Sequence, residues 1–167
     1  MNEEKSLVLS ETLVNDLIPN TSLSQESLAK ICNRLPELHR AKTAVGRKNS
    51  QTTATLMTMT MLADSPYRQM KQCLSQIDNK RNALIEAHFN TQKSKVKIKK
   101  WEKSGTEMDL VKAQEAKVGI EQMRTSAENA MKEIGMYQDI YDEIRTTHGI
   151  PVDWDEEDFE ASEIENA

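Results

Sequence analysis

Apolar side chains recur in alternating steps of four and three residues along 116–144, the spacing that places one stripe on the side of a helix. Glu107 and Asp109 suit the positive N-terminal end of such a helix. Gly149 is typical of its other end. The pattern therefore predicts a helix that begins near Thr106 and ends before Gly149. The stripe consists of Ala116, Ile120, Met123, Ala127, Ala130, Ile134, Tyr137, Tyr141 and Ile144.

A second helix is predicted from the clearest start signal in the chain, where Asp64 or Ser65 can cap a helix and Pro66 fits its first position. Its apolar track continues to about Lys103. Only residues 104–106 separate the two helices, so they must return alongside each other. We therefore expect residues 64–149 to form a long antiparallel coiled-coil hairpin. Its helix-pairing seam is expected to contain Met70, Leu74, Ile77, Leu84 and Ile98 of the first helix and Ile120, Met123, Ile134, Tyr137, Tyr141 and Ile144 of the second.

Shorter apolar patterns precede the hairpin. Residues 7–18 are typical of a short helix or folded arm, and residues 25–35 of a helix with one apolar face. Pro36 is expected to end or kink that helix, and a further short helix follows up to Gly46.

Composition agrees with an all-α fold that has no thick core, because 37% of the residues are hydrophobic and 4% are aromatic. We expect three parts: an N-terminal short-helix region (1–63), the hairpin (64–149) and an acidic C-terminal tail (150–167). No apolar run reaches membrane-spanning length and no signal peptide is recognised, so we expect a soluble cytoplasmic protein without membrane contact. Cys32 and Cys73 are isolated and are expected to be small buried hydrophobes.

The predicted seam is weak for its length. Its alanines bury little surface, and Gly119 and Gly135 lower helix stability. Apolar residues beside the stripe, such as Met131, Met136 and Ile140, supply a second face. We therefore expect a homo-oligomer, with docking of the N-terminal helices onto the hairpin as the monomeric alternative.

Lysines crowd the end of the first long helix in a chain whose net charge is −5. They complement the negative end of the helix dipole, so one interpretation is a solvated helix end. The other is a nucleic-acid interface, in which ammonium groups contact phosphates and an aromatic ring stacks on a base. The candidate residues are Lys93, Lys95, Lys97, Lys99, Lys100, Trp101 and Lys103.

A second basic cluster lies in residues 30–48. Its nucleic-acid candidates are Arg34, Arg40, Lys42, Arg47 and Lys48, with Lys30 beside them. With a turn at Pro36, this segment could form a helix-turn-helix motif, whose second helix enters the DNA major groove. The turn glycine of that motif is absent.

The end of the chain is acidic: residues 151–167 hold eight acids and no base, so the other 150 residues carry a net charge of +3. Residues 153–159 lack the order and the glycine of a calcium loop. No catalytic motif, metal site or cofactor site is recognised, and we expect a protein that is not an enzyme and binds no cofactor.

The layout resembles the terminase small subunits of tailed bacteriophages. The resemblance rests on ADSP at 63–66, which opens the long helical pair after a short helical unit, and on the charged tail. KEIGMYQDIYDEIRTTHGIP at 132–151 is also similar to phage sequences. The resemblance implies ring assembly by the helical pair and a role in selecting or regulating DNA for packaging, without catalytic residues.

These observations favour a non-enzymatic, oligomerising coiled-coil protein that acts as a nucleic-acid-associated assembly factor in phage DNA packaging. If the chain is phage-encoded, it would work in the host cytoplasm. The alternative is a structural, scaffolding or inhibitory protein-binding module that uses the hairpin to grip a virion or host protein.

Overall fold

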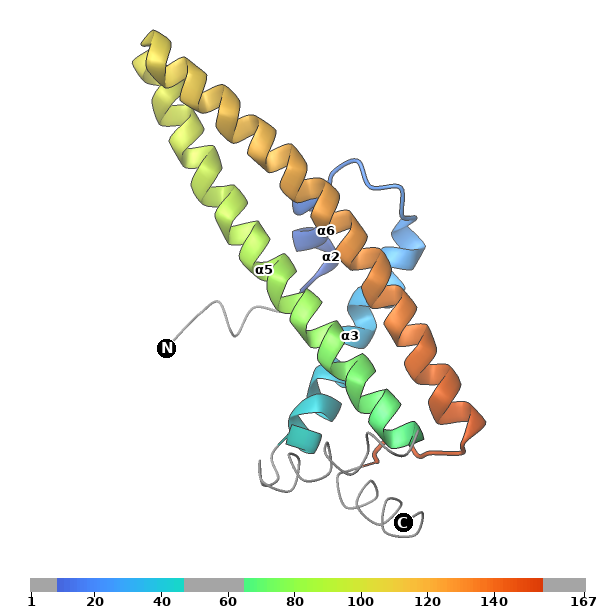
Figure 1. Ribbon diagram of the computed structural model, residues 1–167. Coiled ribbons are helices and arrows are strands. Elements are labelled where there is room, and N and C mark those ends of the chain that lie inside the picture. Colours follow the sequence, from blue (N-terminus) through green and yellow to red (C-terminus); the bar gives the residue numbers. More distant parts are fainter. Residues whose placement is uncertain (1–8, 47–64, 155–167) are drawn as a thin grey trace. The chain divides into compact units, whose positions relative to one another are not determined.

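The computed structural model describes residues 9–46 and 65–154, with the backbone alone for residues 42–46. Four helices make up the described chain: α2 (Glu11–Leu17), α3 (Gln25–Gly46), α5 (Pro66–Ser104) and α6 (Glu107–Thr147). No described residue lies in a strand, so this part of the chain is all-helical as predicted. The two long helices, α5 and α6, pack against each other as a helical hairpin (Figure 1).

The turn between α5 and α6 lies where the sequence predicts it. Gly105 has a φ of 70°, a conformation that favours glycine. The Thr106 hydroxyl accepts a hydrogen bond from the backbone N–H of Asp109 at 3.2 Å and caps α6. The Asp109 carboxylate accepts a further bond from the Ser104 hydroxyl, which lowers the pKa of Asp109. Side chains on both sides of Gly105 therefore fix the end of one helix and the start of the next.

The chain divides into two compact units, which are described separately. Unit 1 contains Met1–Cys32 and Lys80–Glu133. Unit 2 contains Asn33–Asn79 and Ile134–Ala167.

In unit 1, α5 and α6 contact each other in reverse order of residue number. Lys80 of α5 pairs with Glu133 of α6. Further along α5, the hydroxyl of Thr91 donates to the sulfur of Met123 at 3.0 Å. Nearest the turn, Glu102 pairs with Lys117 at 2.7 Å. The apolar side chains buried along these segments are Leu84, Ile85, Ile98, Ala113, Ile120, Ala127 and Met131.

In unit 1, α2 and the loop after it dock onto the hairpin. The Nε2 of Gln92 in α5 donates to the Asp16 carboxylate of α2 at 2.8 Å. Glu128 of α6 accepts from the backbone N–H of Ser22 at 2.7 Å. The described N-terminal segment of this unit buries Leu9, Leu13, Val14, Leu17, Ile18, Leu28, Ile31 and Cys32. This docking covers apolar hairpin surface that would otherwise be exposed.

Unit 2 has a core that includes the residues directly after α6. Ile150 and Trp154 are 5% and 3% exposed, although the sequence analysis assigned them to an acidic tail. The indole N–H of Trp154 donates to the Tyr141 hydroxyl at 2.8 Å, and its ring meets the edge of Tyr67 at 5.5 Å between centroids. The core also contains Leu35, Leu38, Met70, Cys73, Leu74, Ile77, Ile134 and Tyr141.

The sequence predicted that Pro36 ends or kinks its helix, and the predicted end is wrong. Pro36 lies inside α3, which runs unbroken from Gln25 to Gly46, so no second short helix begins after it. The proline lacks a backbone donor, but it is exposed, and buried leucines at 35 and 38 hold the helix on both sides of it. Without a turn at this position, the segment is not a helix-turn-helix motif.

The residues expected in the helix-pairing seam differ in burial. Eight are buried: Met70, Leu74, Ile77, Leu84, Ile98, Ile120, Ile134 and Tyr141. Three are half-buried: Met123, Tyr137 and Ile144. Cys32 and Cys73 are buried and free, as predicted. None of the helices in the described residues is long and apolar enough to cross a membrane.

Candidate nucleic-acid interface

The six predicted lysines lie together on the last turns of α5, in unit 1. We call residues 93–103 the lysine end of α5. Five of its lysines are exposed and Lys95 is half-buried. None of the six comes within 4.0 Å of a carboxylate in the described part of the chain. Their positive charges are therefore not neutralised by ion pairs there.

Helical spacing arranges these lysines in two rows. Lys95, Lys99 and Lys103 are spaced by four, so they follow one side of the helix. Lys93 and Lys97 have the same spacing on the other side, and Lys100 extends that row. The rows flank the solvent-facing side of α5, opposite the buried Ile98.

A groove of about 600 Å³ runs beside the first row in unit 1. Its acids are already paired, Glu102 with Lys117 at 2.7 Å and Glu121 with Arg124 at 2.7 Å. Lys95 and Lys99 carry the charge that remains. The groove is lined by Gln92, Lys95, Val96, Ile98, Lys99, Glu102, Lys117, Ile120, Glu121 and Arg124. An anionic chain lying in this groove would meet more positive than negative charge.

Trp101, the expected stacking residue, is half-buried and packs against a cluster of Ile98, Ala113 and Ile120. Much of its ring therefore contributes to the hairpin core. The solvent-exposed groups of the lysine end are mainly ammonium groups, which bind phosphates and do not stack on bases.

The second predicted basic cluster, in residues 30–48, offers fewer free positive charges for binding phosphates. Arg34 forms a two-pronged ion pair with Asp142, with Nη2 to Oδ1 at 2.8 Å, so its charge is neutralised. Arg40 is exposed, and its Nε donates weakly to the carbonyl of Pro36 at 3.4 Å. The side chain of Lys42 is not described, and Arg47 and Lys48 lie outside the described residues.

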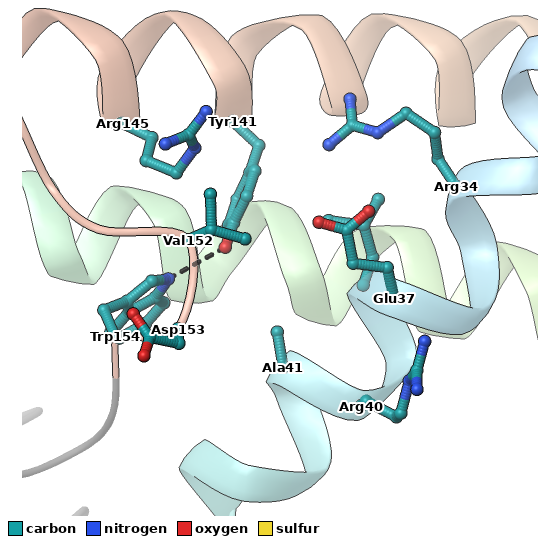
Figure 2. A pocket seen from close by; sticks show the side chains of 10 residues that line it. Arg34, Glu37, Arg40, Ala41, Tyr141, Arg145, Val152, Asp153 and Trp154 are labelled. Carbon is teal, nitrogen blue, oxygen red and sulfur yellow. Dashed lines mark hydrogen bonds between the residues drawn. The ribbon is translucent and has the colours of Figure 1, made fainter.

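Unit 2 also contains a pocket of about 320 Å³ that the sequence analysis missed (Figure 2). Arg34 and Arg145 reach it from α3 and α6, and Trp154 reaches it from the segment after α6. Arg34 is paired, and Nη1 of Arg145 donates to the carbonyl of Ile150 at 3.3 Å. The pocket also contains the acids Glu37 and Asp153. Because the acids offset the arginines, this pocket is a weaker anion site than the lysine end.

Burial shifts the pKa values of two cysteine thiols and one tyrosine hydroxyl in the cores of the two units. It raises the pKa of the Cys32 thiol to about 11 and also raises the pKa of Cys73. Burial likewise raises the pKa of Tyr141. Such thiols are poor nucleophiles near neutral pH. Among the described residues, no group of three or more histidines, cysteines and acids could hold a metal ion.

Comparison of the chain with models of protein families, with curated proteins and with solved structures found no match.

Proposed function

We propose that this protein is a non-enzymatic helical protein that binds nucleic acid through the lysine end of α5 and acts as an assembly factor. The observation that carries the proposal is the set of six lysines on one helix end, none of which has a described carboxylate within 4.0 Å. Its layout resembles phage terminase small subunits. On that basis we place its action in phage DNA packaging, in the host cytoplasm.

Phosphate binding follows from the electrostatics of such a helix end. A polyanion holds condensed counterions, and each lysine that contacts a phosphate releases some of them. Lysine is a flexible point charge, so it contacts the backbone without fixing a base sequence. The lysine end therefore favours affinity over strong sequence selection.

Assembly is the second half of the proposal. We propose that α5 and α6 form an antiparallel coiled coil and that exposed apolar residues of α6 join copies of the chain. In unit 2, Met136 and Ile140 are 49% and 36% exposed. Ile140 also lines a groove of about 630 Å³ with Tyr137 and Ile144. Burial of such side chains between copies would stabilise an oligomer.

Replacement of four lysines tests the nucleic-acid half. A variant with glutamine at 93, 97, 99 and 103 removes charge from exposed sites without emptying the core. Fluorescence anisotropy with a labelled duplex at 50 mM salt should show a loss of affinity of at least tenfold. A control with glutamine at 30 and 132 removes charge from exposed lysines away from the lysine end and should bind nearly as well as the natural chain. Equal loss in both variants would contradict a localised interface.

The alternative is a protein-binding module that grips a virion or host protein. Exposed apolar residues near the hairpin turn favour it: Met108 is 72% exposed and Val111 is 54% exposed. The lysines would then bind acidic side chains of the partner protein. Failure of the natural chain to bind any nucleic acid at 50 mM salt would favour this alternative.

A further inference from the structure

Val96 is an exposed aliphatic side chain within the lysine end. It is 68% exposed, in a helix whose other aliphatic side chain in this stretch, Ile98, is 8% exposed. On the surface of a helix, its neighbours are the residues three and four positions away. They include Lys93, Lys99 and Lys100, so any polyanion that these lysines contact would also lie over Val96.

The dimensions of this helix end fit one groove of duplex DNA. A helix with its side chains is about 10–12 Å across, and the major groove is about 12 Å wide. A phosphate backbone borders the groove on each side. The row of Lys95 and Lys99 would meet one backbone, and the row of Lys93 and Lys97 would meet the other.

We infer that the lysine end of α5 enters the major groove of duplex DNA and that Val96 contacts the methyl group of thymine. This inference rests on the proposed nucleic-acid binding and names its ligand. The major groove displays the C5-methyl of thymine, which apolar side chains contact. The lysines on either side of Val96 contact the two phosphate backbones and hold the helix in the groove. Val96 adds a preference for A·T pairs.

Two other nucleic acids fit this helix end less well. Single strands are bound by stacking on aromatic rings, whereas Trp101 packs against Ile98, Ala113 and Ile120 of the hairpin. The major groove of duplex RNA is too deep and narrow for side chains to read.

The test uses two DNA duplexes of one A·T-rich sequence, one with thymine and one with uracil in its place. Uracil keeps the base pairing and removes only the methyl groups from the major groove. Fluorescence anisotropy with the full chain should show tighter binding to the thymine duplex, by about two- to fourfold for one buried methyl contact. Val96→Ala should reduce this ratio to about one. Val118→Ala, at an exposed site on α6, should keep the ratio of the natural chain.

The other outcomes separate the inference from the proposed function. Equal affinity for both duplexes, or a ratio that Val96→Ala leaves unchanged, would overturn the major-groove inference and leave nucleic-acid binding standing. Tighter binding to a single strand or an RNA duplex of the same sequence would also overturn it. Absence of binding to all of these ligands at 50 mM salt would overturn both.

Discussion

Glu128 joins the loop between α2 and α3 to the hairpin of unit 1. Its carboxylate accepts hydrogen bonds from the hydroxyl and backbone N–H of Ser22 at 2.6 and 2.7 Å, and from the hydroxyl of Thr21 at 3.2 Å. The bond from the Ser22 hydroxyl is the largest cause that lowers the pKa of Glu128 below its ordinary value. Thr21 and Ser22 are thus both connected to α6 by hydrogen bonds to the Glu128 carboxylate.

Removal of that carboxylate should loosen the loop. In Glu128→Ala, the backbone N–H of Ser22 loses its acceptor, so its hydrogen exchange should become faster, measured by NMR at neutral pH. Because the folded pKa is lowered, the stabilisation by Glu128 is present above the ordinary pKa of 4.5 and is lost as the pH falls through the folded pKa. Glu128→Gln should therefore weaken the acid dependence of the exchange. Glu115→Ala, at an exposed site on the same helix, should change neither.

Single residues also show where sequence patterns do not suffice. Ile150 and Trp154 are large apolar residues at the start of an acidic stretch, and their apolar character was a signal of burial. The contacts of Trp154 with Tyr67 and Tyr141 bring together residues that are separated in the sequence. Arg34 was likewise predicted to bind nucleic acid, although Asp142 neutralises it. A charge count along the sequence does not reveal such pairing.

At the scale of elements, helix boundaries followed closely from local chemistry. Pro66 begins α5, and the break at residues 105–106 separates it from α6, because caps and a positive-φ glycine act over a few residues. Pro36 was predicted to end or kink its helix for the same local reason, and the predicted end was wrong because α3 continues through it. Burial of Leu35 and Leu38 outweighs the local cost of a proline inside α3.

Two glycines of the hairpin should respond in opposite ways to alanine. Gly105 has a φ of 70°, so Gly105→Ala should lower the free energy of unfolding by about 1 kcal/mol. Gly119 lies inside α6 and has open space around an added Cβ, so Gly119→Ala should raise it by up to about 1 kcal/mol. Thermal unfolding followed by circular dichroism should show Tm changes of about 2–4 °C with opposite signs. Equal signs would mean that the turn at Gly105 is not formed as described.

At the scale of the whole molecule, the sequence predicted an all-helical chain with a long helical pair, and it did not predict the division into two units. That division depends on which helix segments contact one another, whereas periodicity reports one helix at a time. The predicted parts 1–63, 64–149 and 150–167 follow changes in composition along the chain, whereas each compact unit combines two segments that are separated in the sequence.

Self-association is a prediction for the whole molecule. Light scattering of the purified chain should give a mass that is a multiple of 19.0 kDa. Met136→Glu would place a charge on the exposed apolar face of α6 and should shift the mass toward that of one chain. Val152→Glu, at an exposed site outside the helices, should leave the oligomer intact. A mass of 19.0 kDa for the natural chain at all concentrations would contradict the assembly proposal.

The most direct test of the central claim, that the lysines at the end of α5 bind phosphates, is the salt dependence of binding to duplex DNA. Each phosphate neutralised contributes about −0.9 to the slope of log affinity against log salt, so six lysines predict a slope of about −5. A variant with glutamine at 93, 97, 99 and 103 should reduce that slope to about −2. A natural chain whose slope is near zero, or equal to that of this variant, would contradict the account.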